Sequence, residues 1–219
     1  GTFTDLFLLE RESGAMLRHK LLSTPAEPHL APLQGIREIL AMAQGRGEDI
    51  EFVGLGTTVM TNALLERKGA PTGLVTTEGF RDLLEIARQQ RPHTFDPFVS
   101  KAPPLVPRRL RVEVSERMAA DGSQLVALDQ AGVREALAAL RGGGVEAIAI
   151  CFLHAYANPA HERTAGAVIA RRFPDLAVST SSDVAPEIRE YERTSTPVAN
   201  PYIKPRRNLL IYQAVIGLE

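Results

Sequence analysis

The sequence contains a single cysteine, Cys151, among 219 residues. One cysteine excludes an internal disulfide bond and a metal site built from four thiolates. Cys151 lies in the apolar run 145–153, and burial in such surroundings raises the pKa of a thiol and makes it a poor nucleophile. We therefore expect Cys151 to be a core residue.

The chain also lacks an excess of either charge, because 25 Lys and Arg residues balance 26 Asp and Glu residues. The formal net charge of −1 gives no electrostatic reason to expect nucleic acid or an acidic membrane surface as a partner. No stretch approaches the roughly 18 apolar residues that span a bilayer, and no secretory signal pattern is present. We expect a cytoplasmic protein.

Several catalytic patterns are missing from the sequence. It has no Ser-His-Asp order, no metal-ligand spacing and no Gly-x-x-x-x-Gly-Lys loop. It also has no internal repeat, low-complexity tract or flexible linker. These sites therefore do not compete with the glycine-threonine turns that the sequence does contain.

The first of these turns is Gly56-Thr57-Thr58, between an expected strand at 50–54 and an expected helix at 58–68. Backbone N–H groups at a helix start, the positive end of its dipole and two hydroxyl groups would converge there on one anion. A second glycine-threonine element occupies residues 1–6. Two such turns suggest a nucleotide held between two loops, and we expect the turns to lie close together. The alternative is an ordinary helix N-cap at 56–58 and simple strand residues at 1–6.

Strand and helix patterns alternate along the rest of the chain and predict an α/β domain with a mixed sheet and flanking helices. The expected helices lie at 31–44, after Thr77, after Asp129 and after Asn158-Pro159. The expected strands are a hairpin within 4–19, then 73–76, 110–114 paired with 124–128, 145–153 and 178–180. Five prolines make 89–109 a long ordered loop.

Five blocks, in order along the chain, resemble the signatures of the hydantoinase A/5-oxoprolinase family. They are residues 1–5, 56–70, 76–92, 151–162 and 186–196. The likeness covers about 1–205, which we expect to be the hydantoinase/oxoprolinase N-terminal domain. Residues 206–219 are then the start of a following domain or an added end segment. Since the chain opens inside a motif and closes on an apolar run, we expect it to be a piece of a longer protein.

The resemblance implies the N-terminal lobe of an actin-like, ribonuclease-H-like ATPase that uses ATP and Mg²⁺. Members of the family open small cyclic amides such as 5-oxoproline or hydantoins through a phosphorylated carbonyl intermediate. Other members are ATP-using subunits of acetone and acetophenone carboxylases. The expected partners are a second lobe of the same protein and a hydantoinase B-like subunit or domain, and we expect this piece alone to be inactive. A non-catalytic assembly lobe is the alternative from another class.

The resemblance also implies roles for particular residues, although it assigns no catalytic residue. Phosphate contacts are expected from Thr2, Thr4, Gly56, Thr57 and Thr58. One departure stands beside them, because Leu55 occupies the position where the family usually has histidine. Asp5 is the candidate magnesium ligand, directly or through water, since Mg²⁺ needs few protein oxygens besides phosphates and water.

Four further residues are candidates for substrate contact. Asn62 follows Thr58 by one helical turn and either points into the site or caps neighbouring backbone. Arg88 and Arg91 either bind a carboxylate in bidentate fashion or are solvated loop charges. His154 ends the buried strand, where open α/β sheets place ligands, and its alternative is a structural histidine. The charged cluster 187–193 is interpreted as a salt-bridged helical face, with substrate contact as the alternative.

Overall fold

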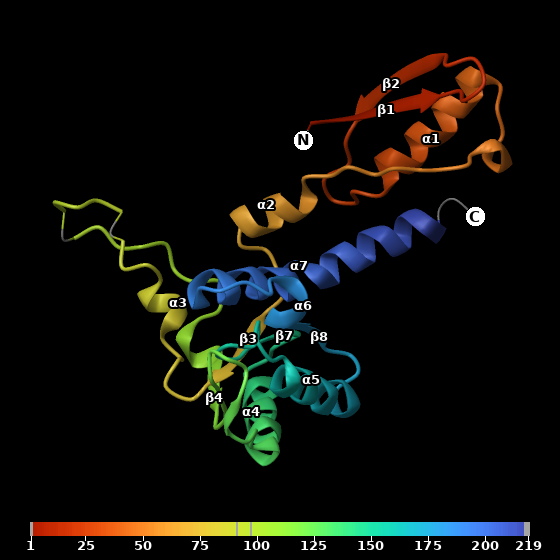
Figure 1. Ribbon diagram of the computed structural model, residues 1–219. Helices are drawn as coiled ribbons and strands as arrows, with labels where there is room; N and C mark the ends of the chain where they lie inside the picture. The colour runs from red at the N-terminus through yellow and green to blue at the C-terminus, as the bar shows by residue number, and fades with distance from the viewer. Residues whose placement is uncertain (1, 91, 97, 217–219) are drawn as a thin grey trace. The chain divides into compact units, whose positions relative to one another are not determined.

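The computed structural model describes residues 2–90, 92–96 and 98–216, with side chains up to Lys204 (Figure 1). The chain forms two compact units, Gly1–Glu66 with Arg206–Glu219, and Arg67–Pro205. The sequence carries no linker-like composition at the division between them. No helix among the described residues is both long and apolar enough to cross a membrane.

The first unit contains a β-hairpin that packs against one helix. β1 (Phe3–Leu9) and β2 (Met16–Leu22) are antiparallel, and α1 (Leu30–Ala43) contacts both strands. The helix approaches closely because Gly35 has no side chain, and a Cβ at that position would lie 2.4 Å from Leu6 Cδ1. The hairpin and the first helix expected from the sequence are confirmed.

The segment after α1 differs from the sequence prediction. The short 3₁₀ helix η1 (Gly47–Asp49) follows, and α2 (Val59–Leu65) comes later. The strand expected at 50–54 is wrong, because the described residues there have no regular structure and Phe52 is 85% exposed. An apolar run becomes a strand only where a neighbouring strand pairs with it. Arg67, with φ +55°, has left the helical region, so α2 ends before Lys68.

The second unit is built on a parallel sheet with the strand order β4-β3-β7-β8. Its strands are β3 (Thr72–Thr77), β4 (Arg111–Val114), β7 (Ala147–Cys151) and β8 (Ala177–Thr180). Every residue of β3 and β7 is buried, as expected for the central strands of a parallel sheet. The antiparallel strands lie in separate sheets, β1 with β2 and β5 (Arg117–Met118) with β6 (Gln124–Val126).

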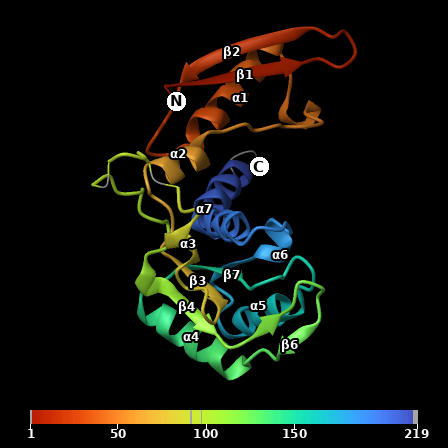
Figure 2. The same ribbon diagram turned by 60° about the vertical axis from the view of Figure 1, so that its left-hand side comes forward.

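Helices cover both faces of this sheet. α4 (Gln130–Gly142) and α5 (Ala160–Arg172) lie on one side, and the first part of α7 (Glu190–Ile216) lies on the other (Figures 1 and 2). Three short helices complete the unit: α3 (Leu83–Ile86), η2 (Arg108–Leu110) and α6 (Ser181–Val184). The core joins both layers, since Leu137 of α4, Ile169 of α5 and Val198 of α7 all belong to it. The α/β class with flanking helices is confirmed.

Two local predictions in this unit are wrong. Thr77 does not cap a helix, because it ends β3; Gly79, with φ +87°, turns the chain, and α3 begins only at Leu83. The strand at 110–114 does not form a hairpin with 124–128. Instead β4 joins β3 in parallel, and Arg111, expected on an exposed position, is completely buried. Its guanidinium donates to Glu85 at 2.9 Å and to the Val106 carbonyl at 3.0 Å.

Candidate functional site

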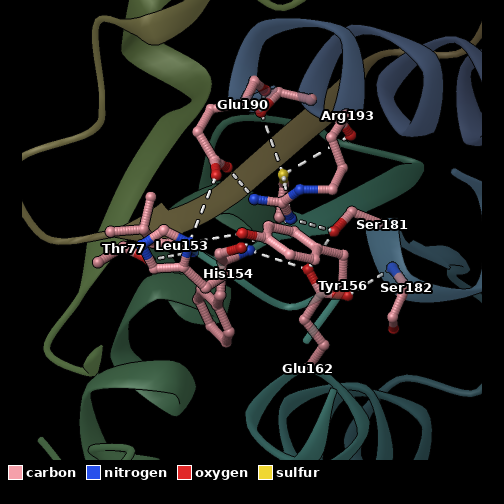
Figure 3. A network of polar contacts seen from close by, with 12 residues as sticks. Thr77, Leu153, His154, Tyr156, Glu162, Ser181, Ser182, Glu190 and Arg193 are labelled. Carbon is pink, nitrogen blue, oxygen red and sulfur yellow. Dashed lines mark hydrogen bonds and ion pairs between the residues drawn. The ribbon is translucent and has the colours of Figure 1, made fainter. Parts of the chain in front are cut away.

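The carboxyl ends of β3, β7 and β8 gather polar side chains from several elements (Figure 3). Thr77 ends β3, His154 follows β7, and Ser181 follows β8. Arg193 comes from the first turns of α7, which lie on the face of the sheet opposite to α4 and α5 (Figure 2). Open α/β sheets bind their ligands at this edge of the strands, so this cluster is the candidate site of the second unit.

Arg193 lies at the centre of the cluster and is completely buried. Its Nη1 donates at 2.8 Å to both the Phe152 carbonyl and Ser181 Oγ. Its Nη2 is ion-paired with Glu190, and the Tyr156 ring centroid lies 5.6 Å from the guanidinium carbon. Within the described part of the chain, Nε has no hydrogen-bond partner. Carbonyl, hydroxyl and carboxylate oxygens therefore hold this guanidinium in one orientation.

Glu162, near the start of α5, is the buried anion of the cluster. Its carboxylate accepts hydrogen bonds from the Phe152 amide at 2.9 Å, the Ser181 hydroxyl at 2.6 Å and the Ser182 amide at 2.8 Å. Burial raises the pKa of this carboxyl group, and its hydrogen bonds to Phe152, Ser181 and Ser182 oppose that shift only in part. The Ser181 hydroxyl therefore links the buried anion to the buried cation Arg193.

These contacts fix the segment that carries His154. The Phe152 peptide is held at both its amide and its carbonyl, and the Leu153 amide donates to Thr77 Oγ1 at 2.8 Å. His154 follows with φ +56°, in the left-handed region that few non-glycine residues adopt. The buried groups thus set the position of the imidazole.

The imidazole of His154 stays accessible, with its side chain 25% exposed. Its Nδ1 lies 3.3 Å from the Tyr156 hydroxyl and 4.0 Å from a carboxylate oxygen of Glu190. Among the residues described, nothing hydrogen-bonds to its Nε2. A histidine with one nitrogen held and the other free is suited to give or take a proton at the free nitrogen.

A second buried network supports the same edge. Glu116 accepts a hydrogen bond from the Thr77 hydroxyl, and its other oxygen lies 2.8 Å from His161 Nδ1. His161 Nε2 lies 3.0 Å from the Gln124 side-chain oxygen. Since Thr77, Glu116 and His161 are all buried, the network is structural support for the end of β3 rather than a binding surface.

The glycine-threonine turn lies in the first unit and is exposed along its length. Thr57 Oγ1 accepts a hydrogen bond from the Val59 amide at 3.2 Å. Thr58 stands at the cap position of α2 without a side-chain capping bond, and a Cβ added to Gly56 would meet no atom within 4 Å. This open, hydroxyl-bearing turn has room for an anion. Leu55, beside it, is 48% exposed and does not pack into a core.

The other predicted turn begins at Gly1, which lies outside the described residues. Thr4 Oγ1 hydrogen-bonds to Ser23 Oγ at 2.9 Å, and the Thr2 carbonyl accepts from the Ser23 amide at 3.0 Å. Asp5 is on the opposite face of β1 from Thr4 and lies 3.3 Å from Lys20 Nζ. No hydrogen bond between the two turns occurs in the part of the chain described. Their shared phosphate site stays a prediction.

The remaining candidates have different surroundings. The backbone amide of Asn62 donates to the Thr58 carbonyl at 2.8 Å, which confirms that one helical turn separates the two residues. Arg88 is half exposed, and its Nε is ion-paired with Glu192 of α7. Arg91 lies outside the described residues. Of the substrate candidates that the structure describes, His154 is the one in the cluster at the sheet edge.

The sequence did not predict Glu162 as a member of the site, and it offered substrate contact by the cluster 187–193 only as the alternative. Arg193 was interpreted as part of a salt-bridged helical face; it is ion-paired with Glu190, but it is buried rather than exposed. The sequence did carry a signal for burial. Thr194, Val198 and Tyr202 are spaced by four residues, so they share one face of α7, and that face is buried together with the adjacent Arg193. Glu162 gave no comparable signal, since its partners lie after two different strands.

The fold and this edge define an α/β domain with a polar, partly buried site where its parallel strands end. The model of the family described as Hydantoinase/oxoprolinase N-terminal region matches residues 1–173 of the chain. The chain therefore belongs to this family, as its sequence blocks predicted.

Two relatives are much longer than this chain, and the chain matches only part of each. Caprolactamase subunit alpha of Pseudomonas jessenii is 39% identical over 212 residues, which cover 94% of this chain and 30% of the relative. 5-oxoprolinase 1 of Arabidopsis thaliana is 33% identical over 236 residues, covering 94% of this chain and 18% of the relative. The chain thus spans less than a third of either relative.

Solved structures agree with the fold. The crystal structure of the ATP-dependent caprolactamase from Pseudomonas jessenii matches with a TM-score of 0.90 at 36% identity, covering 100% of this chain and 32% of that one. The nucleotide-free structure of acetone carboxylase matches with a TM-score of 0.85 at 26% identity, covering 99% and 33%. Similar proteins are therefore ATP-dependent enzymes of two kinds.

Proposed function

We propose that this chain is the N-terminal part of an ATP-dependent hydrolase that opens a small cyclic amide of the lactam, hydantoin or 5-oxoproline type. The observation that carries this proposal is that the chain has a higher sequence identity to the caprolactamase structure than to the acetone carboxylase structure. The caprolactamase structure matches at 36% identity and the acetone carboxylase structure at 26%. Both solved structures share the fold of this chain, and a fold alone does not decide the reaction. The higher sequence identity to the caprolactamase therefore favours a cyclic amide as substrate.

The turn 56–58 is proposed to hold phosphate groups of ATP. The open space beside Gly56 and the uncapped Thr58 hydroxyl support this, because phosphate oxygens need donors that are not already used. When bound, ATP supplies a phosphoryl group that turns a resonance-stabilised amide oxygen into a better leaving oxygen. Thr2 and Thr4 are proposed as further phosphate contacts.

Asp5 is proposed as the protein ligand of Mg²⁺, directly or through water. Its carboxylate is exposed, and its ion-pair partner Lys20 is exposed as well, so the pair is weak enough to yield to a divalent ion. Mg²⁺ is commonly held by one or two carboxylates together with phosphates and water, so a single protein carboxylate is enough for this role.

His154 is proposed as the group that moves a proton during ring opening. Its Nδ1 is held next to Tyr156 and Glu190, and its Nε2 is free to exchange a proton with substrate or water. Asn62 is proposed as a substrate-contacting amide in the first unit. Arg88 is the weakest of the candidates, because Glu192 already occupies its guanidinium.

The rest of the enzyme is proposed to come from a second lobe of the same protein and from a hydantoinase B-like subunit or domain. The chain covers 30% of the caprolactamase relative, and that relative is named as a subunit, which supports both. Two other functions are weighed against this proposal. The acetone carboxylase likeness favours a ketone carboxylase subunit, and Leu55 in place of histidine favours a lobe without turnover.

The nucleotide part of the proposal is tested in the intact protein with Thr57→Val and Thr58→Val together. Removing both hydroxyl groups should raise the KM for ATP at least about a hundredfold, since hydrogen bonds to charged groups contribute about 1.5–3 kcal/mol each and about 1.4 kcal/mol is a factor of ten. Thr164→Val is the matched control, because its hydroxyl bonds only to the Ala160 carbonyl within α5. An unchanged KM for ATP in the double variant would contradict the assignment.

A further inference from the structure

A hollow of about 460 Å³ lies at the carboxyl end of the edge strand β8, between α5, α6 and α7. The polar residues that line it are Arg163, Ser179, Thr180, Asp183, Asn200 and Lys204. Neither His154 nor Arg193 lines it, so it is separate from the cluster described above. Its position is still the one where open α/β sheets bind ligands.

Two cations, Arg163 and Lys204, line this hollow beside a single carboxylate, Asp183. In the described part of the chain, Arg163 and Lys204 have no ion-pair partner. Elsewhere in the same unit, Arg141 is paired with Asp175 at 3.1 Å. The acidic residue of the lining, Asp183, already accepts the Thr180 hydroxyl at 2.7 Å. The lining therefore carries a net positive charge and would attract an anion.

Neutral donors face the same space. Ser179 Oγ accepts from Asn200 Nδ2 at 2.5 Å, which leaves the Ser179 hydroxyl proton free to donate. The backbone supplies more. The Ala177 amide donates toward β7, to the Glu146 carbonyl, and strand residues alternate, so the amides of Val178 and Thr180, two residues that line the hollow, face away from β7. An anion here would meet donors from strand and helices together.

We infer that this hollow is a binding site for a compact oxyanion, a carboxylate or phosphate group of a small metabolite, anchored by Arg163 and Lys204. A guanidinium presents paired donors that match either oxyanion, and the ammonium adds a point charge. The volume exceeds that of one anionic group, so the hollow has room for further atoms of a ligand. This inference does not depend on the proposed catalytic function.

The test uses the intact protein, saturated with a non-hydrolysable ATP analogue so that the nucleotide site is filled. Inorganic phosphate and succinate are titrated separately, and binding is followed by NMR of each ligand. We expect saturable binding of at least one, and the arm that saturates identifies the oxyanion. Arg163→Gln and Lys204→Gln should each weaken it about tenfold, as expected for a lost charge-assisted hydrogen bond.

Arg171→Gln is the matched control, because Arg171 lies in the last turn of the same helix and does not line the hollow. It should leave the affinity within about twofold. A thermal unfolding scan of each variant separates lost binding from lost folding. The inference is overturned if neither ligand shows saturable binding, or if Arg163→Gln and Lys204→Gln both bind as tightly as the wild type. It is also overturned if Arg171→Gln weakens binding as much as those two variants do.

Discussion

Arg193 and Glu162, two oppositely charged and completely buried residues, meet at the hydroxyl group of Ser181. Arg193 Nη1 donates to Ser181 Oγ at 2.8 Å, and the same hydroxyl donates to Glu162 at 2.6 Å. Both side chains also bind the Phe152 peptide. Buried charges are tolerated only when they are paired and hydrogen-bonded, so Arg193 and Glu162 must keep these bonds. Because both are bound to the Phe152 peptide, they hold in place the chain segment that leads to His154.

Ser181→Ala should destabilise the protein by about 1–3 kcal/mol, because it leaves one hydrogen bond of each buried charge unmade. Chemical denaturation gives the free energy of unfolding. Ser195→Ala is the matched control, since the Ser195 hydroxyl bonds to the Glu192 carbonyl within α7 rather than to either buried charge. Equal losses in the two variants would contradict the role of Ser181.

The raised pKa of Glu162 predicts a pH dependence of stability. Between the ordinary carboxyl pKa of 4.5 and the raised folded value, the folded state binds a proton that the unfolded state has released. Stability contributed by Glu162 is therefore present below pH 4.5 and is lost as the pH rises through the folded pKa. Glu162→Gln cannot titrate. The stability of the wild type relative to this variant should fall as the pH rises through that window, and a constant difference would contradict the account.

His154→Gly separates function from folding. Glycine adopts positive φ without strain, so the substitution should not lower the free energy of unfolding. It removes the proposed proton-moving group, and kcat of the intact protein should fall about a hundredfold. Steady-state kinetics and denaturation on the same preparation give both quantities. A variant that keeps wild-type kcat would exclude His154 from the chemistry.

Leu55→His should raise kcat of the intact protein on a cyclic amide. Imidazole would supply a hydrogen-bond donor for developing oxygen charge, and such a donor contributes roughly 2–4 kcal/mol of transition-state stabilisation. The melting temperature should hardly change, because Leu55 is 48% exposed. A folded variant with no gain in rate would show that the position lies away from the reacting atoms.

Local signals in the sequence predicted several elements correctly. Asp129 was expected to cap a helix, and its carboxylate accepts from the Ala131 amide at 3.0 Å. The apolar run 145–153 was expected to be a buried strand, and every residue of β7 is buried. Caps and continuous burial can be predicted because neighbouring residues carry the whole signal.

Pairings between distant residues could not be predicted in the same way. Arg111 alternates with apolar residues and was placed on an exposed face, but its partner Glu85 lies 26 residues earlier and holds it in the core. Likewise, His154 was a candidate from its place after a strand, whereas Glu162 and Arg193, which position it, come from two helices. Such sites depend on tertiary packing more than on local pattern.

The central claim is tested most directly by measuring ADP release from the intact protein with caprolactam, 5-oxoproline or hydantoin, with and without bicarbonate. The account predicts that at least one cyclic amide stimulates ATP hydrolysis, that its ring-opened product forms (an amino acid from caprolactam or 5-oxoproline, an N-carbamoyl amino acid from hydantoin), and that bicarbonate is not required. Hydrolysis stimulated only by a ketone together with bicarbonate would contradict it in favour of a carboxylase subunit. No stimulation by any of these compounds would contradict it in favour of a lobe without turnover.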